Sequence, residues 1–247
     1  MSINLEAFEK LTPKAVRAFW KSRSQSVREQ KKRGRSDQGN RAGVTTGRNM
    51  DGFIGMVSRI VRDNGIDKTQ IYTRGRANLS LPGYYRPMKQ WDLLVIDKKK
   101  QYLVAAIEFK SQVGPSFGNN FNNRIEEAVG NAVDFNTAFR DNAFGESPKP
   151  FLGYFFVFED CDESRRPVRF HSPHFPAFKD FENTSYAQRY EIFCRRLVRE
   201  RLYDSAALLL TKREEAGQGI HASMSPLTSA ERFAATLAGK AAVISAT

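Results

Sequence analysis

Residues 91–110 read WDLLVIDKKKQYLVAAIEFK. Two apolar runs of strand length, 92–96 and 102–109, flank a polar turn, which is the pattern of a β-hairpin. A third, strongly aromatic run at 151–158 predicts another strand, and 124–140 has the apolar spacing of a helix that crosses between strands. This order predicts an α/β fold, in which a mixed sheet is flanked by helices.

Apolar residues at helical spacing predict further helices on both sides of this region. An N-terminal helix is expected in two pieces, because Thr12-Pro13 fits an N-cap followed by proline at the first helical position. The last helix begins with the capping-box pattern of Thr228 and Glu231. The expected helices besides 124–140 are 3–20, 50–61, 185–201, 203–215 and 229–243.

The chain has 247 residues, with 39 lysines and arginines against 27 acids, so its net charge is +12. This excess favours a polyanionic partner, since Lys and Arg neutralise phosphates and release counterions. Solubility alone is the alternative explanation. Cys161 and Cys194 lie far apart without a second Cys or His at ligand spacing, which indicates free thiols of a reducing compartment. Without a signal peptide or a membrane-length apolar run, we expect a cytoplasmic protein.

Three charged side chains mark the ends of the two hairpin strands. Asp92 begins the first strand and Glu108 lies near the end of the second, so antiparallel pairing sets the carboxylates side by side. Oxygen ligands suit the hard cation Mg²⁺, and the Phe109 carbonyl is a further candidate ligand. Lys110 falls on the same face as Glu108, where it can orient a water or stabilise developing charge. The sequence thus predicts a metal-dependent nuclease with Asp92, Glu108 and Lys110 as catalytic residues.

The spacing of an acid, any residue and a lysine is common by chance. The same triplet occurs at Asp97-Lys98-Lys99, where the polar turn predicts a solvent-exposed position. Glu108 and Lys110 instead end an apolar strand, where charges cost free energy unless they are paired or bind metal. The alternative to a metal site is a salt-bridged strand end.

Asp92, Glu108 and Lys110, with fifteen residues between the two acids, resemble the core of the PD-(D/E)xK nuclease superfamily. Trp91 stands where that motif has its least constrained residue, a proline. Three segments look more specifically like the XhoI-type restriction endonucleases. They are LPGYYRP (81–87), QWDLLV (90–95) and EFKSQVGPSFGNN (108–120).

This resemblance implies a restriction-endonuclease-like sheet and a homodimeric type II enzyme that uses Mg²⁺ to cut both DNA strands within the palindrome CTCGAG. A cognate DNA methyltransferase would be a functional partner in the same restriction-modification system. The superfamily often places another acidic metal ligand on the helix before the sheet, which makes Asp51 a candidate. The alternative for Asp51 is a charge favoured by the helix macrodipole, and we expect the same of Glu126 and Glu127.

Two segments are candidates for contact with DNA. The arm 21–50 carries nine lysines and arginines against two acids, so it favours phosphate contacts. The Gly/Asn loop 114–123 offers amide donors and acceptors suited to base edges and phosphates. A solvated tail and an Asx-turn connector are the alternatives. The individual candidates are Arg33, Arg35, Arg41, Arg48, Lys89, Asn119, Asn120, Asn122, Asn123 and Arg124.

We expect one endonuclease domain over 1–247, with the basic arm at 21–50, a catalytic core at 51–158 and a helical C-terminal part at 185–247.

Two other functions stay open. A non-catalytic nucleic-acid-binding protein would share the basic arm, but it gives no reason for the charged strand ends. A repair or junction nuclease of the same superfamily would share those residues and differ in its substrate.

Overall fold

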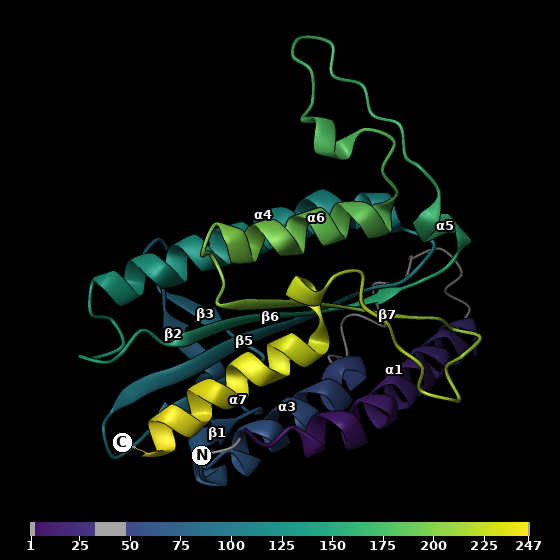
Figure 1. Cartoon of the computed structure of the whole chain (residues 1–247). Coiled ribbons are helices and arrows are strands. Elements are labelled where there is room, and N and C mark those ends of the chain that lie inside the picture. The colour runs from purple at the N-terminus through teal and green to yellow at the C-terminus, as the bar shows by residue number, and fades with distance from the viewer. Residues whose placement is uncertain (1–2, 33–47, 247) are drawn as a thin grey trace.

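A five-stranded mixed sheet forms the middle layer of the protein (Figure 1). The computed structural model describes residues 3–32 and 48–246. In pairing order, the strands are β1 (Ile71–Tyr72), β4 (Leu93–Asp97), β5 (Tyr102–Gln112), β6 (Phe151–Glu159) and β7 (Ser205–Thr211). β1 pairs antiparallel with β4 and β4 with β5, whereas β5, β6 and β7 are parallel. The predicted mixed sheet and its hairpin are confirmed.

Helices cover both faces of this sheet (Figure 1). One face is covered by α4 (Phe117–Arg140) and α6 (Tyr186–Arg199), and the other by α1 (Glu6–Lys32), α3 (Asp51–Asp63) and α7 (Ala230–Ala246). α4 and α6 each connect two parallel strands, which a tight turn cannot join, so both cross over the sheet. Each face of the sheet has its own apolar cluster. Successive residues of a strand mostly belong to the two clusters in turn, because their side chains point to opposite faces.

β6 is buried along its whole length, because helices lie on both of its faces. Phe155 and Val157 belong to the cluster under α1, α3 and α7. Tyr154, Phe156 and Phe158 belong to the cluster under α4 and α6. A strand without an exposed face has a continuous apolar sequence, which explains why 151–158 was predictable.

A separate two-stranded sheet leads into the hairpin of β4 and β5. It consists of β2 (Ser80–Pro82) and β3 (Met88–Gln90), which pair antiparallel. The chain then passes to Trp91, whose backbone N–H donates to the Leu79 carbonyl at 2.8 Å. β3 is therefore held directly before Asp92.

The turn between β2 and β3 is fixed to α4 by one carboxylate. Asp134 Oδ1 accepts hydrogen bonds from the backbone N–H groups of Tyr84 and Tyr85, each at 2.8 Å. Asp134 Oδ2 accepts from Arg86 Nε at 2.7 Å, and Arg86 Nη2 donates to Asn131 Oδ1 at 2.7 Å. The turn is thus held in one position while the Tyr84 and Tyr85 side chains stay exposed.

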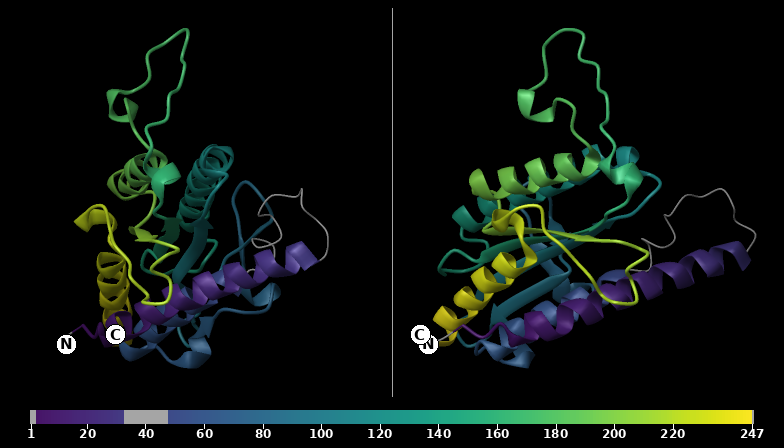
Figure 2. Two further views of the ribbon diagram at one scale, coloured as in Figure 1. Left: turned by 90° about the vertical axis from the view of Figure 1, so that its right-hand side faces the viewer. Right: turned by 45° about the vertical axis from the view of Figure 1, so that its right-hand side comes forward.

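The segment between α5 (Asp162–Arg165) and α6 projects from the layered part of the molecule (Figure 2). It exposes Phe170, Phe175 and Phe178. The 3-10 helices of the described residues are η1 (Arg48–Met50), η2 (Lys68–Gln70), η3 (Ala77–Leu79), η4 (Lys179–Phe181) and η5 (Pro226–Thr228). Among the described helices, none combines the length and apolar character that a membrane span requires.

The expected helix 203–215 is wrong, because this segment contains β7. Residues 206–210 are an apolar run buried on both faces, and periodicity cannot distinguish such a strand from a buried helix. The C-terminal part 185–247 is therefore not wholly helical. The helices expected at 50–61, 185–201 and 229–243 are confirmed as α3, α6 and α7.

Two predictions about the N-terminal region also need correction. α1 is continuous through Pro13, and the Thr12 hydroxyl donates to the Phe8 carbonyl at 2.5 Å instead of capping a second helix. The segment 21–50 is not a separate arm where it is described, since α1 continues to Lys32. Arg23 is buried, with Nη2 2.9 Å from Ser111 Oγ, because its helix packs against the sheet.

The Gly/Asn loop is shorter than expected. α4 begins at Phe117 and not near residue 124, so the asparagines lie on its first turns.

Asp97 differs from its predicted exposure as well. It is buried, and its carboxylate accepts hydrogen bonds from the backbone N–H groups of Lys99 and Lys100 at 2.9 and 3.0 Å. Such a carboxylate stabilises the turn that follows the strand.

Candidate active site

The first acid of the predicted site is held by backbone contacts to β5. Asp92 directly precedes β4, and its N–H donates to the Ile107 carbonyl at 3.3 Å. Its Oδ2 accepts a hydrogen bond at 2.7 Å from the backbone N–H of Phe109, the residue after Glu108. The antiparallel pairing thus brings the two acids together, as the spacing predicted.

Glu108 is the most enclosed group of the site, with a side chain only 4% exposed. Lys110 Nζ lies 2.6 Å from Glu108 Oε1, and Lys89 Nζ lies 2.7 Å from Glu108 Oε2. Lys110 also lies 3.7 Å from Glu127 Oε2. One buried carboxylate is therefore held between two ammonium groups, one on each oxygen.

The two acids differ in their ionisation. Burial, followed by the nearby charge of Glu108, raises the pKa of Asp92 from 3.8 to about 6, although Phe109 N–H, Lys110 and Lys89 act in the opposite direction. Burial also opposes ionisation of Glu108, but Lys110 and Lys89 outweigh it and hold the pKa of Glu108 below its ordinary value. Burial lowers the pKa of Lys110, yet the Glu108 carboxylate outweighs this and leaves it raised. Of the two acids, Glu108 is therefore the one whose surroundings favour the ionised form.

The oxygens of this site fit a hard divalent cation. The raised pKa of Asp92 reflects burial beside a second carboxylate, a repulsion that a cation between them would relieve. Ile107 and Phe109 both direct backbone groups toward β4, through their contacts with Asp92. Because alternate residues of a strand share one side, the Phe109 carbonyl faces the same edge and can complete the donor set.

A third acidic ligand is not brought to this pair. Asp51 is exposed at the first residue of α3, and the described residues contain no group of three or more His, Cys, Asp or Glu side chains that could hold a metal ion. Asp51 therefore stays a prediction. Its position in the first turn of a helix fits the macrodipole alternative.

The predicted DNA contacts are scattered over several elements. Asn119, Asn122 and Asn123 are exposed on the first turns of α4. Asn120 Nδ2 donates to the Ser116 carbonyl at 3.1 Å. Arg33, Arg35 and Arg41, and the side chain of Arg48, lie outside the described residues. All of these DNA contacts stay predictions.

Three residues near Glu108 have contacts that sequence reasoning missed. Lys89 was expected to contact DNA, but here it binds Glu108. Arg124 was also expected to contact DNA, but its Nη1 lies 2.8 Å from Glu127 Oε2, and Glu127 in turn approaches Lys110. Glu127 lies well inside α4, so its expected place at the start of a helix, where the macrodipole favours an acid, is wrong. The spacing of Arg124 and Glu127 would have indicated their pairing once the true start of the helix was known.

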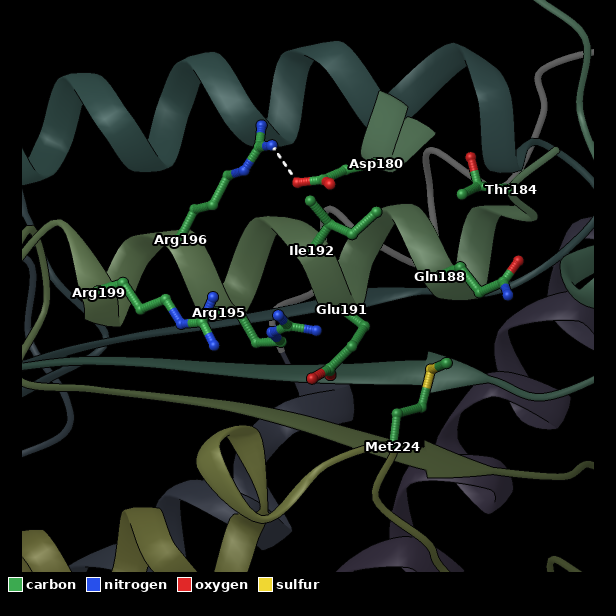
Figure 3. A pocket seen from close by; sticks show the side chains of 9 residues that line it. All are labelled: Asp180, Thr184, Gln188, Glu191, Ile192, Arg195, Arg196, Arg199 and Met224. Carbon is green, nitrogen blue, oxygen red and sulfur yellow. Dashed lines mark hydrogen bonds and ion pairs between the residues drawn. The ribbon is translucent and has the colours of Figure 1, made fainter. Parts of the chain in front are cut away.

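A pocket of about 380 Å³ opens elsewhere on the molecule, beside α6 (Figure 3). Its basic side chains are Arg195, Arg196 and Arg199, and Arg196 Nη2 pairs with Asp180 Oδ2 at 2.9 Å. None of its lining residues belongs to the group around Glu108. The predicted site at the strand ends is therefore separate from this pocket.

Comparison with known proteins places this chain in a defined family. The family model described as Restriction endonuclease XhoI matches residues 29–223. The type II restriction enzyme XhoI of Xanthomonas vasicola is 51% identical over 198 residues, which cover 80% of this chain and 78% of that protein. The type II restriction enzyme BstVI of Geobacillus stearothermophilus is 48% identical over 188 residues, covering 75% of this chain and 83% of that protein. No solved structure matches the chain significantly.

Proposed function

The chain belongs to the XhoI restriction endonuclease family and is a site-specific deoxyribonuclease, and we propose that it cuts both strands of DNA at the palindrome CTCGAG with Mg²⁺. The likeness to XhoI-type enzymes supports this target. Type II restriction enzymes generally need a divalent metal, and an all-oxygen donor set suits hard cations such as Mg²⁺. The observation that carries the proposal is the contact of Asp92 with the backbone beside Glu108, within reach of Lys110.

Asp92, Glu108 and the Phe109 carbonyl are the groups that would hold the cation. When bound, it supplies charge stabilisation at the scissile phosphate and a more acidic attacking water. Glu108 keeps its negative charge in the buried site because two ammonium groups face it. Lys110 stands beside that carboxylate, where its ammonium can donate to the attacking water and stabilise charge that develops on the phosphate oxygens.

We also propose that the protein acts as a homodimer in the cytoplasm. A homodimer would supply one active centre to each strand of a palindrome, because a two-fold protein matches a two-fold site. A cognate DNA methyltransferase would protect the host genome. The proposed location is the cytoplasm, which fits the two free thiols, Cys161 and Cys194. One endonuclease domain over 1–247 is the proposed organisation.

Digestion of a long DNA of known sequence tests activity and target together. With Mg²⁺ we expect discrete fragments whose ends map to CTCGAG, and with EDTA no cleavage. Glu108→Gln and Lys110→Ala should each lower the cleavage rate at least about a hundredfold and retain specific DNA binding in Ca²⁺. Glu126→Gln is the matched control, since this exposed acid touches none of the site residues.

Each outcome has a distinct meaning. Substantial cleavage by both the Glu108 and Lys110 variants would contradict the site. Fragments that end elsewhere would contradict the target sequence but not the nuclease. A gel shift without cleavage by the wild-type protein would favour the non-catalytic binder, and structure-selective products would favour a repair or junction nuclease.

A further inference from the structure

A residue outside the acid-x-lysine motif makes direct contact with Glu108. Lys89 lies on β3, in the two-stranded sheet, and reaches across to a carboxylate on β5. Its Nζ is 2.7 Å from Glu108 Oε2, and its side chain is only 12% exposed. A partly buried lysine against a buried carboxylate on another sheet is a specific contact, unlike the exposed ion pairs of the surface.

The charges of the site cancel when Lys89 is included. Asp92 and Glu108 contribute two negative charges when ionised, and Lys89 and Lys110 contribute two positive charges. A divalent cation that entered without any rearrangement would meet two ammonium groups already seated on Glu108. At distances of a few ångströms this repulsion is large, so at least one ammonium has to leave the Glu108 carboxylate.

Lys89 has other partners ready when it leaves Glu108. Its Nζ donates to the Gln90 carbonyl at 2.8 Å and lies 4.6 Å from the centre of the Trp91 ring. Trp91 is buried and packs edge-to-face on Phe135 at 5.4 Å, so this aromatic face is fixed. Lys110, in contrast, sits on the same strand as Glu108 and also approaches Glu127. Both lysines have a second partner, but the proposed chemistry needs the Lys110 ammonium beside Glu108. The ammonium that can withdraw is therefore that of Lys89, which keeps its contacts with Gln90 and Trp91.

We infer that Lys89 is a positioning residue, whose ammonium serves as the resident counter-ion of Glu108 and is displaced when a divalent cation binds. This rests on the proposed function, because it takes Asp92 and Glu108 as ligands of the cation. Lys89 thereby holds the Glu108 carboxylate in position in the metal-free protein, and its charge weakens the binding of metal.

Calorimetric titration of Mn²⁺ into the DNA-free protein tests the displacement. Lys89→Met removes the competing ammonium, so we expect it to bind Mn²⁺ at least about tenfold more tightly than the wild type does. Lys89→Gln can still donate to Glu108 but carries no charge, and it should follow Lys89→Met. Lys89→Arg restores the charge and should bind Mn²⁺ like the wild type. Two neutral variants keep the test decisive if one of them fails to fold.

Lys99→Met is the matched control, because it changes the net charge equally at an exposed turn residue and should leave the affinity for Mn²⁺ unchanged. Affinities of both neutral Lys89 variants at or below the wild-type value would overturn the inference. A gain confined to Lys110→Met would overturn it as well. If the wild type still cuts DNA with Mg²⁺ in either case, only the role of Lys89 fails, whereas a wild type that never cuts DNA refutes the proposed function itself.

Discussion

The Asp92 carboxylate accepts a hydrogen bond at 2.7 Å from the backbone N–H of Phe109, the residue that follows Glu108. The main chain of β5 thus fixes one acid beside the strand that carries the other. A backbone N–H stabilises a carboxylate but does not neutralise it, so burial and the charge of Glu108 still raise the pKa of Asp92 to about 6. A divalent cation between the two carboxylates would relieve this repulsion.

The stability of the metal-free protein should therefore depend on Asp92. Between pH 3.8 and about 6 the folded protein binds more protons at Asp92 than the unfolded chain does. The contribution of Asp92 to the free energy of unfolding therefore falls as the pH rises through this range. Asp92→Asn keeps an acceptor for Phe109 N–H and should raise the free energy of unfolding by about 3 kcal/mol at pH 8 in EDTA. Urea unfolding at pH 8 and at pH 4 measures this, with the gain absent at pH 4.

Asp51→Asn provides the control for that experiment. Asp51 is exposed at a helix N-terminus, where a negative charge is favourable, so its replacement should give no gain in stability. An equal gain from both variants would show that total charge, and not the buried position of Asp92, sets the effect.

Addition of a divalent cation should stabilise the wild-type protein. Ca²⁺ at about a hundred times its dissociation constant should raise the free energy of unfolding by about 2.7 kcal/mol, because the ion binds the folded state alone. Glu108→Gln should lose most of this gain, whereas Glu126→Gln should retain it. Thermal unfolding with and without Ca²⁺ gives the comparison, and an undiminished shift for Glu108→Gln would contradict the ligand assignment.

Asp134 should matter for stability through the β2–β3 turn. Burial opposes its ionisation, but the backbone N–H of Tyr85, the Arg86 side chain and the backbone N–H of Tyr84 hold its pKa below the ordinary value. Asp134→Ala leaves these donors without their acceptor and should lower the free energy of unfolding by about 2–4 kcal/mol. Asp134→Asn keeps an acceptor and should cost less. Chemical denaturation ranks the two variants. An unchanged free energy of unfolding in Asp134→Ala would show that the turn keeps its position without this carboxylate.

Gly153 on β6 is predicted to be intolerant of a side chain. A Cβ at this position would lie 2.7 Å from the ring of Phe151 and 2.9 Å from that of Phe233. Gly153→Ala should therefore lower the free energy of unfolding by about 1–3 kcal/mol. Gly130→Ala, at an exposed α4 position with open space around the new methyl group, should instead raise it by about 0.5–1 kcal/mol. Equal effects of the two substitutions would contradict the packing at Gly153.

Prediction from the sequence succeeded where local pattern and tertiary position agree. β4, β5 and β6 were predictable because each is an apolar run of strand length bounded by polar residues. β7 was mistaken for a helix because a short apolar run buried on both faces has no distinguishing period. The start of α4 was missed because its first turns are rich in asparagine and glycine, which favour loops, and Phe117 and Phe121 packing against the core overrides that preference.

The sequence by itself determined the hairpin and the placement of Asp92, Glu108 and Lys110, because strand alternation and antiparallel pairing are local rules. Only the tertiary structure decided that Lys89 reaches Glu108 from another sheet, that Asp134 holds the turn beside it, and that Arg23 is buried. These contacts join residues from separate elements, and their geometry depends on how whole helices and sheets pack. A periodic pattern reports which face of an element is buried but not which residue of another element it meets.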